Sequence, residues 1–194
     1  MKVNEIFYSL QGEGLAAGRP AVFLRLSGCN LQCHFCDTQH QQGTLMTDDE
    51  ILQAVGRYGC HYLVVTGGEP SLFLTEAFVA KLKAQGHYVA VETNGTRPLP
   101  SNVDWVTVSP KFEYVEGPEA QLCQQHIDEL KVVYDGNNRM ELYEAIAADH
   151  YLVQPCDVGD PIRNDDITRR AIDFAKANPR WRLSLQMHKL LNIR

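Results

Sequence analysis

Residues 21–38 read AVFLRLSGCNLQCHFCDT, a short apolar run followed at once by a glycine and three cysteines. A second stretch of the same kind, YLVVTGGEP, occupies residues 62–70. Short, nearly continuous apolar runs are typical of parallel strands that are covered on both faces. Polar and glycine-rich loops directly after such strands indicate a β/α fold whose chemistry lies at the strand ends.

The rest of the chain repeats this alternation of short apolar runs and helical stretches. Strands are predicted at 21–27, 62–66, 88–92, 103–108, 128–134 and 151–154, with a seventh candidate at 182–186. Helices are predicted at 47–58, 74–85, 138–148 and 165–177. The short, proline-rich segment 94–102 predicts a reduced connection instead of a helix. Alternating strands and helices imply right-handed crossovers and a parallel sheet.

Chain length limits the size of this sheet. About six parallel strands in 194 residues predict an α/β fold, an incomplete TIM-like barrel, because the complete eight-unit barrel needs roughly 250 residues. Since no linker or repeat interrupts the pattern, residues 1–194 are predicted to form a single domain. Thr47 and Glu50 form a capping-box pattern at one helix start, and Asp165 or Asp166 is expected near the cap of another.

Unusual motifs directly follow the predicted strands. They are Gly28-Cys29, Gly67-Gly68-Glu69-Pro70, Thr93-Asn94-Gly95, Ser109-Pro110-Lys111, Asp135-Gly136 and Pro155-Cys156-Asp157. In parallel β/α folds the carboxyl ends of the strands share one edge, and ligands bind there. The motifs therefore predict a single site at one mouth of the barrel.

Composition and charge limit the classes of partner. With 18 Lys and Arg against 24 Asp and Glu, the net charge is -6, which argues against nucleic acid or an anionic membrane as the main partner. No stretch is apolar and long enough to span a bilayer. The amino-terminal segment also lacks the features of a signal peptide. We therefore expect a cytoplasmic protein.

Cys29, Cys33 and Cys36 are spaced so that one loop could place three thiolates on one iron–sulfur cluster. The next cysteine, Cys60, lies beyond a predicted helix, so the fourth iron would be free for an exogenous ligand. An aromatic ring at Phe35 could shield the cluster and lie against an adenine ring.

Two other uses of these cysteines remain open at this point. A structural zinc ion needs four protein ligands, and His34 or His40 could supply the fourth, although a Cys-x3-Cys spacing fits a zinc knuckle poorly. Disulfides would leave one of the three cysteines unpaired and would suit an exported protein. The remaining cysteines, Cys60, Cys123 and Cys156, are interpreted as incidental buried thiols.

Two motifs in order resemble the radical S-adenosylmethionine superfamily. Cys-x3-Cys-x-aromatic-Cys after the first barrel strand is similar to its cluster signature, and Gly67-Gly68-Glu69-Pro70 is similar to its GGEP motif. The resemblance implies a 4Fe–4S cluster whose open iron chelates S-adenosylmethionine, and one-electron cleavage to a 5′-deoxyadenosyl radical. Glycine in the second motif allows close backbone approach. Glu69 could orient that loop or accept from the ligand's ammonium group.

Further motifs resemble the 7-carboxy-7-deazaguanine synthases, over essentially the whole chain. They are Ser-Leu-Gln-Gly-Glu-Gly at 9–14, Cys-Asp-Thr at 36–38, Glu-Thr-Asn-Gly at 92–95, Ser-Pro-Lys at 109–111 and Leu-Gln-x-His-Lys-x-Leu-Asn-Ile at 185–193. This resemblance implies a lyase that contracts 6-carboxy-5,6,7,8-tetrahydropterin to 7-carboxy-7-deazaguanine, with loss of ammonia and with magnesium, on the route to queuosine and other 7-deazapurines. Activases of glycyl-radical enzymes have similar amino-terminal segments, but the motifs at both termini favour the synthases.

The resemblance also assigns expected roles to single residues. The cluster ligands would be Cys29, Cys33 and Cys36. Residues lining S-adenosylmethionine would be Phe35, Cys36, Asp37, Gly68, Ser109, Pro110, Lys111, Gln154, Pro155, Cys156 and Asp157. Substrate contacts would be Leu10, Gln11, Gly12, Arg25, Thr66 and the terminal carboxylate of Arg194, with Glu13 and His188 as secondary candidates. Thr38 would be the magnesium ligand.

Partners follow from the same resemblance. It implies a small-molecule pterin substrate, an external reductant such as flavodoxin, and a homodimer. Open edges of a small barrel could be covered by a second copy.

Overall fold

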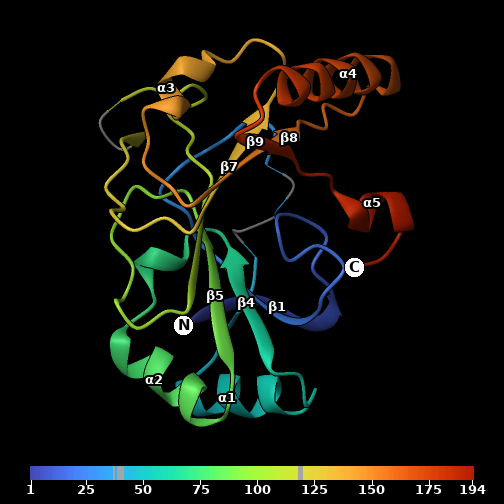
Figure 1. Cartoon of the computed structure of the whole chain (residues 1–194). Coiled ribbons are helices and arrows are strands. Elements are labelled where there is room, and N and C mark those ends of the chain that lie inside the picture. Colours follow the sequence, from blue (N-terminus) through green and yellow to red (C-terminus); the bar gives the residue numbers. More distant parts are fainter. Residues whose placement is uncertain (37, 39–41, 118–119) are drawn as a thin grey trace.

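The computed structural model describes residues 1–36, 38, 42–117 and 120–194 (Figure 1). The strands are β1 (Lys2–Leu10), β2 (Pro20–Leu26), β3 (Thr44–Leu45), β4 (Tyr62–Gly67), β5 (Tyr88–Thr93), β6 (Trp105–Val108), β7 (Glu129–Tyr134), β8 (His150–Pro155) and β9 (Trp181–Leu183). The helices are α1 (Asp48–Gly56), α2 (Glu76–Ala84), α3 (Met140–Glu144), α4 (Pro161–Ala177) and α5 (Met187–Leu191), with a 3₁₀ turn at Pro70–Leu72. None of these helices is long and apolar enough to cross a membrane.

All strands of the described residues belong to one sheet, in the order β3-β1-β2-β4-β5-β6-β7-β8-β9. From β2 to β9 every neighbouring pair in this order is parallel, which confirms the predicted parallel sheet. The order has two ends, β3 and β9, so the sheet is an incomplete barrel. The sequence did not predict β3, nor that β1 pairs antiparallel with β2 in front of the first barrel strand.

Helices pack on the outside of the sheet and form two separate hydrophobic clusters with it. Ile51 and Val55 of α1 and Phe78 of α2 pack with the outward side chains of β2, β4 and β5, at the lower end of Figure 1. At the opposite end, α4 packs on β8 and β9 through Ile167 and Ala171. Because both faces of the central strands are covered, their apolar runs are nearly continuous.

Helix boundaries follow local capping chemistry. The predicted capping box is confirmed: Thr47 Oγ1 accepts from the Glu50 backbone N–H at 3.3 Å, and Glu50 accepts from the Thr47 N–H at 2.7 Å. The expected cap at Asp165 or Asp166 is wrong. Helix α4 begins four residues earlier than predicted, at Pro161, because Asp160 accepts from the Ile162 N–H at 2.9 Å and proline suits the first helical turn.

Two other predictions of secondary structure differ from the structure. The helix predicted at 138–148 is shorter, since α3 covers only Met140–Glu144. The sequence also did not predict α5, which follows β9 and carries the carboxyl-terminal motif. Residues 94–102 contain no helix, as predicted.

Candidate active site

A cavity of about 700 Å³ lies at the carboxyl ends of the parallel strands. Most of the predicted site residues line it, namely Leu10, Gln11, Gly12, Arg25, Cys29, Cys33, Phe35, Cys36, Thr38, Thr66, Gly68, Ser109, Lys111, Gln154, Pro155, Cys156, Asp157 and Arg194. Glu13 and His188 also line it. Asp135, Gly136 and Pro110 are not among the described lining residues, and Pro110 is buried. Asp37 lies outside the described residues.

The three clustered cysteines are free thiols on the wall of this cavity. Burial raises the pKa of the Cys29 and Cys33 thiols, and the charges of neighbouring thiols raise it further. Three thiols from one loop, facing one cavity and without a disulfide, fit a cluster that is bound at three of its irons.

Within the described residues no three His, Cys, Asp or Glu side chains, the three cysteines included, are grouped closely enough to hold a single metal ion. The His34 ring packs at 5.2 Å from that of Phe35 and at 5.9 Å from that of Tyr114. His40 lies outside the described residues.

Side chains that the sequence did not single out hold the cysteine loop in place. Asn30 donates to Thr96 Oγ1 at 2.9 Å and accepts from Asn94 Nδ2 at 3.1 Å, which ties the loop to the end of β5. The Phe35 ring packs edge-on against Tyr114, with 4.8 Å between ring centroids. The sequence signal for this network is a pair of asparagines, Asn30 within the cysteine loop and Asn94 directly after β5.

Gly68 brings the second motif against the first. Its N–H donates to Leu26 O at 2.9 Å, and the N–H of Glu69 donates to Gly28 O at 2.8 Å. A Cβ at Gly68 would lie 1.9 Å from Gly28 O, so only glycine fits this approach. The Gly28–Cys29 loop and the Gly67–Pro70 loop are thus held together by main-chain contacts.

Glu69 is fully buried beneath this junction. Its carboxylate accepts from Thr93 Oγ1 at 2.6 Å and from the N–H groups of Asn94 at 2.7 Å and Ser71 at 2.9 Å. A carboxylate with these partners fixes the loops to which they belong. Of the two roles considered for Glu69, the contacts support loop orientation.

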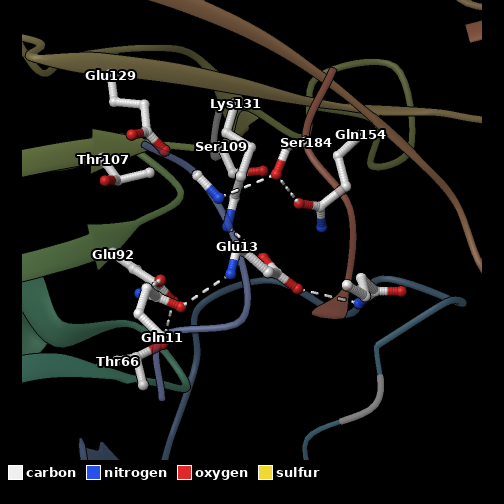
Figure 2. A network of polar contacts seen from close by, with 12 residues as sticks. Gln11, Glu13, Thr66, Glu92, Thr107, Ser109, Glu129, Lys131, Gln154 and Ser184 are labelled. Atoms are coloured by element: carbon white, nitrogen blue, oxygen red, sulfur yellow. Dashed lines mark hydrogen bonds and ion pairs between the residues drawn. The ribbon is translucent and has the colours of Figure 1, made fainter. Parts of the chain in front are cut away.

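A network of polar side chains forms the floor of the cavity (Figure 2). Glu92 of β5 accepts from Gln11 Nε2 and from Thr66 Oγ1, both at 2.9 Å. Ser184 accepts from the Gly14 N–H at 2.9 Å and donates to Gln154 at 2.8 Å. The network therefore joins the amino-terminal turn, the strand ends and the carboxyl-terminal segment around one space.

Glu13 and Lys131 form a nearly buried ion pair within this network. Burial alone would raise the pKa of Glu13, but the charge of Lys131, with hydrogen bonds from Lys131, Gln154 and Gln186, lowers it to about 2. Burial would also lower the pKa of Lys131, yet the nearby Glu13 and Glu92 charges raise it. Both groups are therefore charged at neutral pH.

Replacing Lys131 with methionine is expected to lower the free energy of unfolding by about 3 kcal/mol, because Glu13 would stay buried without its cation. The pair stabilises the fold above pH 4.5, the ordinary pKa of glutamate, and this contribution is lost as pH falls towards about 2. Urea unfolding at pH 7 and at pH values below 4.5 measures both effects. Lys81→Met removes an exposed lysine of the Asp48 ion pair and should change little. An equal loss in both variants would contradict the account.

Lys111 is the second lysine of the cavity and is half-buried. Its Nζ donates to the backbone O and to Oγ of Ser109, each at 2.6 Å. Burial lowers its pKa to about 8, while the neighbouring Cys33 and Glu69 favour the charged form. It supplies a cation on the same side of the cavity as the cysteines.

The remaining predicted residues lie along the rim near the chain end. Arg25 Nη1 donates to Thr38 Oγ1 at 3.1 Å, and Ser9 Oγ donates to Arg194 O at 2.6 Å. The N–H of Met187 donates to Gly12 O at 2.9 Å, which places the α5 segment beside the amino-terminal turn. The first and last segments of the chain therefore form one wall.

The other cysteines match their prediction only in part. Cys156 is buried and lines the cavity, and Cys60 is half-buried, but Cys123 is exposed, so its interpretation as a buried thiol was wrong. It lies in an irregular segment between β6 and β7, where no apolar periodicity could have placed it.

Comparisons with known proteins agree with this geometry. The family model described as the Radical SAM superfamily matches residues 24–111. A 7-carboxy-7-deazaguanine synthase from Bacteroides thetaiotaomicron is 51% identical over 193 residues, covering 100% of this chain and 98% of that protein. A synthase of the same name from Burkholderia multivorans is 42% identical, covering 98% of each.

Solved structures give the same result for the fold. The crystal structure of QueE from Escherichia coli matches with a TM-score of 0.76 and 29% identity, over 96% of this chain and 94% of that one. Streptococcus suis SuiB bound to S-adenosylmethionine matches with a TM-score of 0.50 and 14% identity, over 84% of this chain and 45% of that one. The second likeness concerns the fold alone.

Proposed function

Because this chain belongs to the 7-carboxy-7-deazaguanine synthase family of radical S-adenosylmethionine enzymes, we propose that it converts 6-carboxy-5,6,7,8-tetrahydropterin to 7-carboxy-7-deazaguanine with loss of ammonia. It is a lyase of 7-deazapurine biosynthesis. The observation that carries the substrate proposal is the meeting of the cysteine loop, the Gly67–Pro70 loop and Arg25 at one cavity.

The cofactors are a 4Fe–4S cluster, S-adenosylmethionine and magnesium. When bound, the cluster and S-adenosylmethionine supply a radical that abstracts a hydrogen atom from the substrate. Cys29, Cys33 and Cys36 hold the cluster, and Asn30 keeps their loop against the end of β5. Phe35, packed on Tyr114, screens this side of the cavity from water.

We assign S-adenosylmethionine binding to the residues that the sequence resemblance indicates. They are Phe35, Cys36, Asp37, Gly68, Ser109, Pro110, Lys111, Gln154, Pro155, Cys156 and Asp157. Gly68 lets its loop approach the Gly28–Cys29 loop, because no side chain stands between them, and both loops then reach the S-adenosylmethionine site together. Lys111, anchored on Ser109, presents a positive charge that suits a carboxylate.

The substrate binds on the polar floor and the rim. Arg25 grips its carboxylate, since a guanidinium offers two parallel donors to two oxygens. Gln11 and Thr66, both held by Glu92, meet the polar edge of the ring together with Leu10 and Gly12. The main-chain oxygen of Arg194, which accepts from Ser9 Oγ at 2.6 Å, also accepts from the substrate's donors.

Replacing Thr38 with alanine is expected to raise the magnesium concentration for half-maximal activity by roughly tenfold, a loss of about 1.4 kcal/mol. The hydroxyl oxygen would be the protein's own ligand to the ion, and water and substrate oxygens would complete the shell. Magnesium titrations at saturating substrate measure the shift, and iron content should stay unchanged. Thr38→Ser keeps the hydroxyl and is the matched control. An unaltered magnesium response in Thr38→Ala would remove Thr38 from the metal site.

The proposed reaction is tested by anaerobic incubation of the reconstituted enzyme with reductant, S-adenosylmethionine and 6-carboxy-5,6,7,8-tetrahydropterin. Mass spectrometry should detect 7-carboxy-7-deazaguanine, formed only when both small molecules are present. Cleavage of S-adenosylmethionine without this product would contradict the substrate assignment. A reconstituted cluster that supports no cleavage would contradict the radical chemistry as well.

We also propose that the enzyme is a cytoplasmic homodimer reduced by flavodoxin. Exposed apolar side chains support a second copy as partner, among them Leu190 at 72% and Tyr8 at 50% of full exposure. Sedimentation equilibrium would give the mass of two chains if this is correct and of one chain if it is wrong.

A further inference from the structure

Glu5 stands at the centre of the wall that the first and last segments form. It lies on β1 directly opposite Arg25 of β2, because a bulge between Val3 and Glu5 shifts the register there. Oε1 of Glu5 accepts from Arg25 Nε at 3.0 Å, and Oε2 accepts from Arg194 Nη2 at 2.7 Å. One carboxylate thus pairs with two arginines that are far apart in the sequence.

The side chains around this carboxylate face the cavity. Glu5, Phe7 and Arg25 all line it, and the guanidinium carbons of Arg194 and Arg25 lie 5.3 Å and 6.0 Å from the Phe7 ring centre. Phe7 stacks on Phe23 at 4.9 Å between centroids, so the two guanidinium groups lie beside a stacked aromatic pair. The Glu5 carboxylate therefore contacts Arg25 at the wall of the cavity and is not merely part of an ion pair on the outer surface.

The contact to Nε has a geometric consequence. A guanidinium is planar, and its Nε donor and its two terminal nitrogens point in fixed directions. A carboxylate bound to Nε restrains the plane about the last side-chain bond and therefore aims the terminal nitrogens. In this structure one of them, Nη1, is directed to Thr38 at 3.1 Å. The plane held by Glu5 thus points towards the residue assigned to magnesium.

We propose that Glu5 is a positioning residue that aims the Arg25 guanidinium at the substrate's carboxylate. This inference rests on the proposed function, since it takes a carboxylate as the group that Arg25 binds. When the carboxylate and magnesium bind, Arg25 Nη1 exchanges Thr38 for a carboxylate oxygen while Nε stays on Glu5. The exchange is required because Thr38 Oγ1 would otherwise face both the guanidinium and the metal ion, which repel each other.

The test compares two fluorescent probes, 6-carboxypterin and pterin, which differ by the carboxylate alone. The reconstituted enzyme with S-adenosylmethionine and magnesium should bind 6-carboxypterin more tightly than pterin. Glu5→Gln keeps the size of the side chain but removes its charge, and should lower this preference by about tenfold with pterin affinity unchanged. Asp48→Asn removes the same charge from the distant ion pair with Lys81 and should leave the preference as in the wild type.

A double-mutant cycle separates positioning from a general effect. If Glu5 acts through Arg25, adding Glu5→Gln to an Arg25→Gln variant should change the preference no further. A Glu5→Gln variant that keeps the full preference, or that weakens both probes equally, overturns the proposal, even if its melting temperature falls. A wild type without any preference overturns the proposal together with the assignment of Arg25, whereas an intact preference with a wrong reaction product contradicts only the proposed reaction.

Discussion

Replacing Cys33 with alanine is expected to abolish the iron–sulfur cluster and all cleavage of S-adenosylmethionine. In the proposed site each of the three thiolates would bind a different iron, so the loss of one would leave an iron without its protein ligand. The other cysteines of the described residues lie outside this loop, so none of them can replace Cys33 within it. They are Cys60, Cys123 and Cys156. The variant should purify colourless after reconstitution, with no 5′-deoxyadenosine formed under reductant.

The matched control for this variant is Cys123→Ala. Cys123 is exposed and is not among the described residues that line the cavity, so its removal should leave iron content and cleavage as in the wild type. Iron and sulfide analysis, with quantification of 5′-deoxyadenosine, measures both variants. Cofactor cleavage by Cys33→Ala at the wild-type rate would refute the role of Cys33 as a ligand.

Replacing Gly68 with alanine is expected to be nearly as damaging, although glycine has no side chain to lose. The new Cβ would lie 1.9 Å from Gly28 O and 2.5 Å from Gly28 C, so the main chain before Cys29 would have to move. Overpacking of this kind costs about 1–3 kcal/mol of stability. Because the displaced loop carries Cys29, a proposed cluster ligand, we expect loss of most of the iron and of S-adenosylmethionine cleavage.

Gly56→Ala is the matched control for Gly68→Ala. Gly56 is the last residue of α1, and a Cβ there meets only Gln85 Oε1, at 3.9 Å. Alanine at this position should keep or slightly raise the melting temperature, because it is the better helix former. Thermal denaturation and iron analysis check both variants. A Gly68→Ala protein with wild-type stability and iron content would show that the two loops need not touch.

The fold could be predicted wherever local chemistry decides it. The strands of the barrel were predictable because each is a short apolar run, and α1 because Thr47 and Glu50 specify its start. The start of α4 was not predictable in this way. The charge-rich stretch 163–173 offered Asp165 and Asp166 as caps, whereas the cap in the structure is Asp160, followed by Pro161. The antiparallel pairing of β1 depends on a register with β2 that no single segment encodes.

The site was predictable where a motif carries it, and not where distant residues meet. Motif residues such as Cys29 and Arg25 lie at the cavity as expected. The pair of Glu13 with Lys131 joins positions 118 residues apart, so spacing could not predict it. Lys131 and Glu92 could have been noticed as charges inside otherwise apolar strands, since an interior charge must find a partner.

The central claim is that three protein thiolates hold the cluster and leave one iron open to S-adenosylmethionine. Mössbauer spectroscopy of protein reconstituted with ⁵⁷Fe tests it most directly, by comparing the spectrum before and after S-adenosylmethionine is added. The account predicts that one iron in four changes its parameters to those of a site with added nitrogen and oxygen ligands. Four equivalent irons that do not respond to S-adenosylmethionine would contradict it.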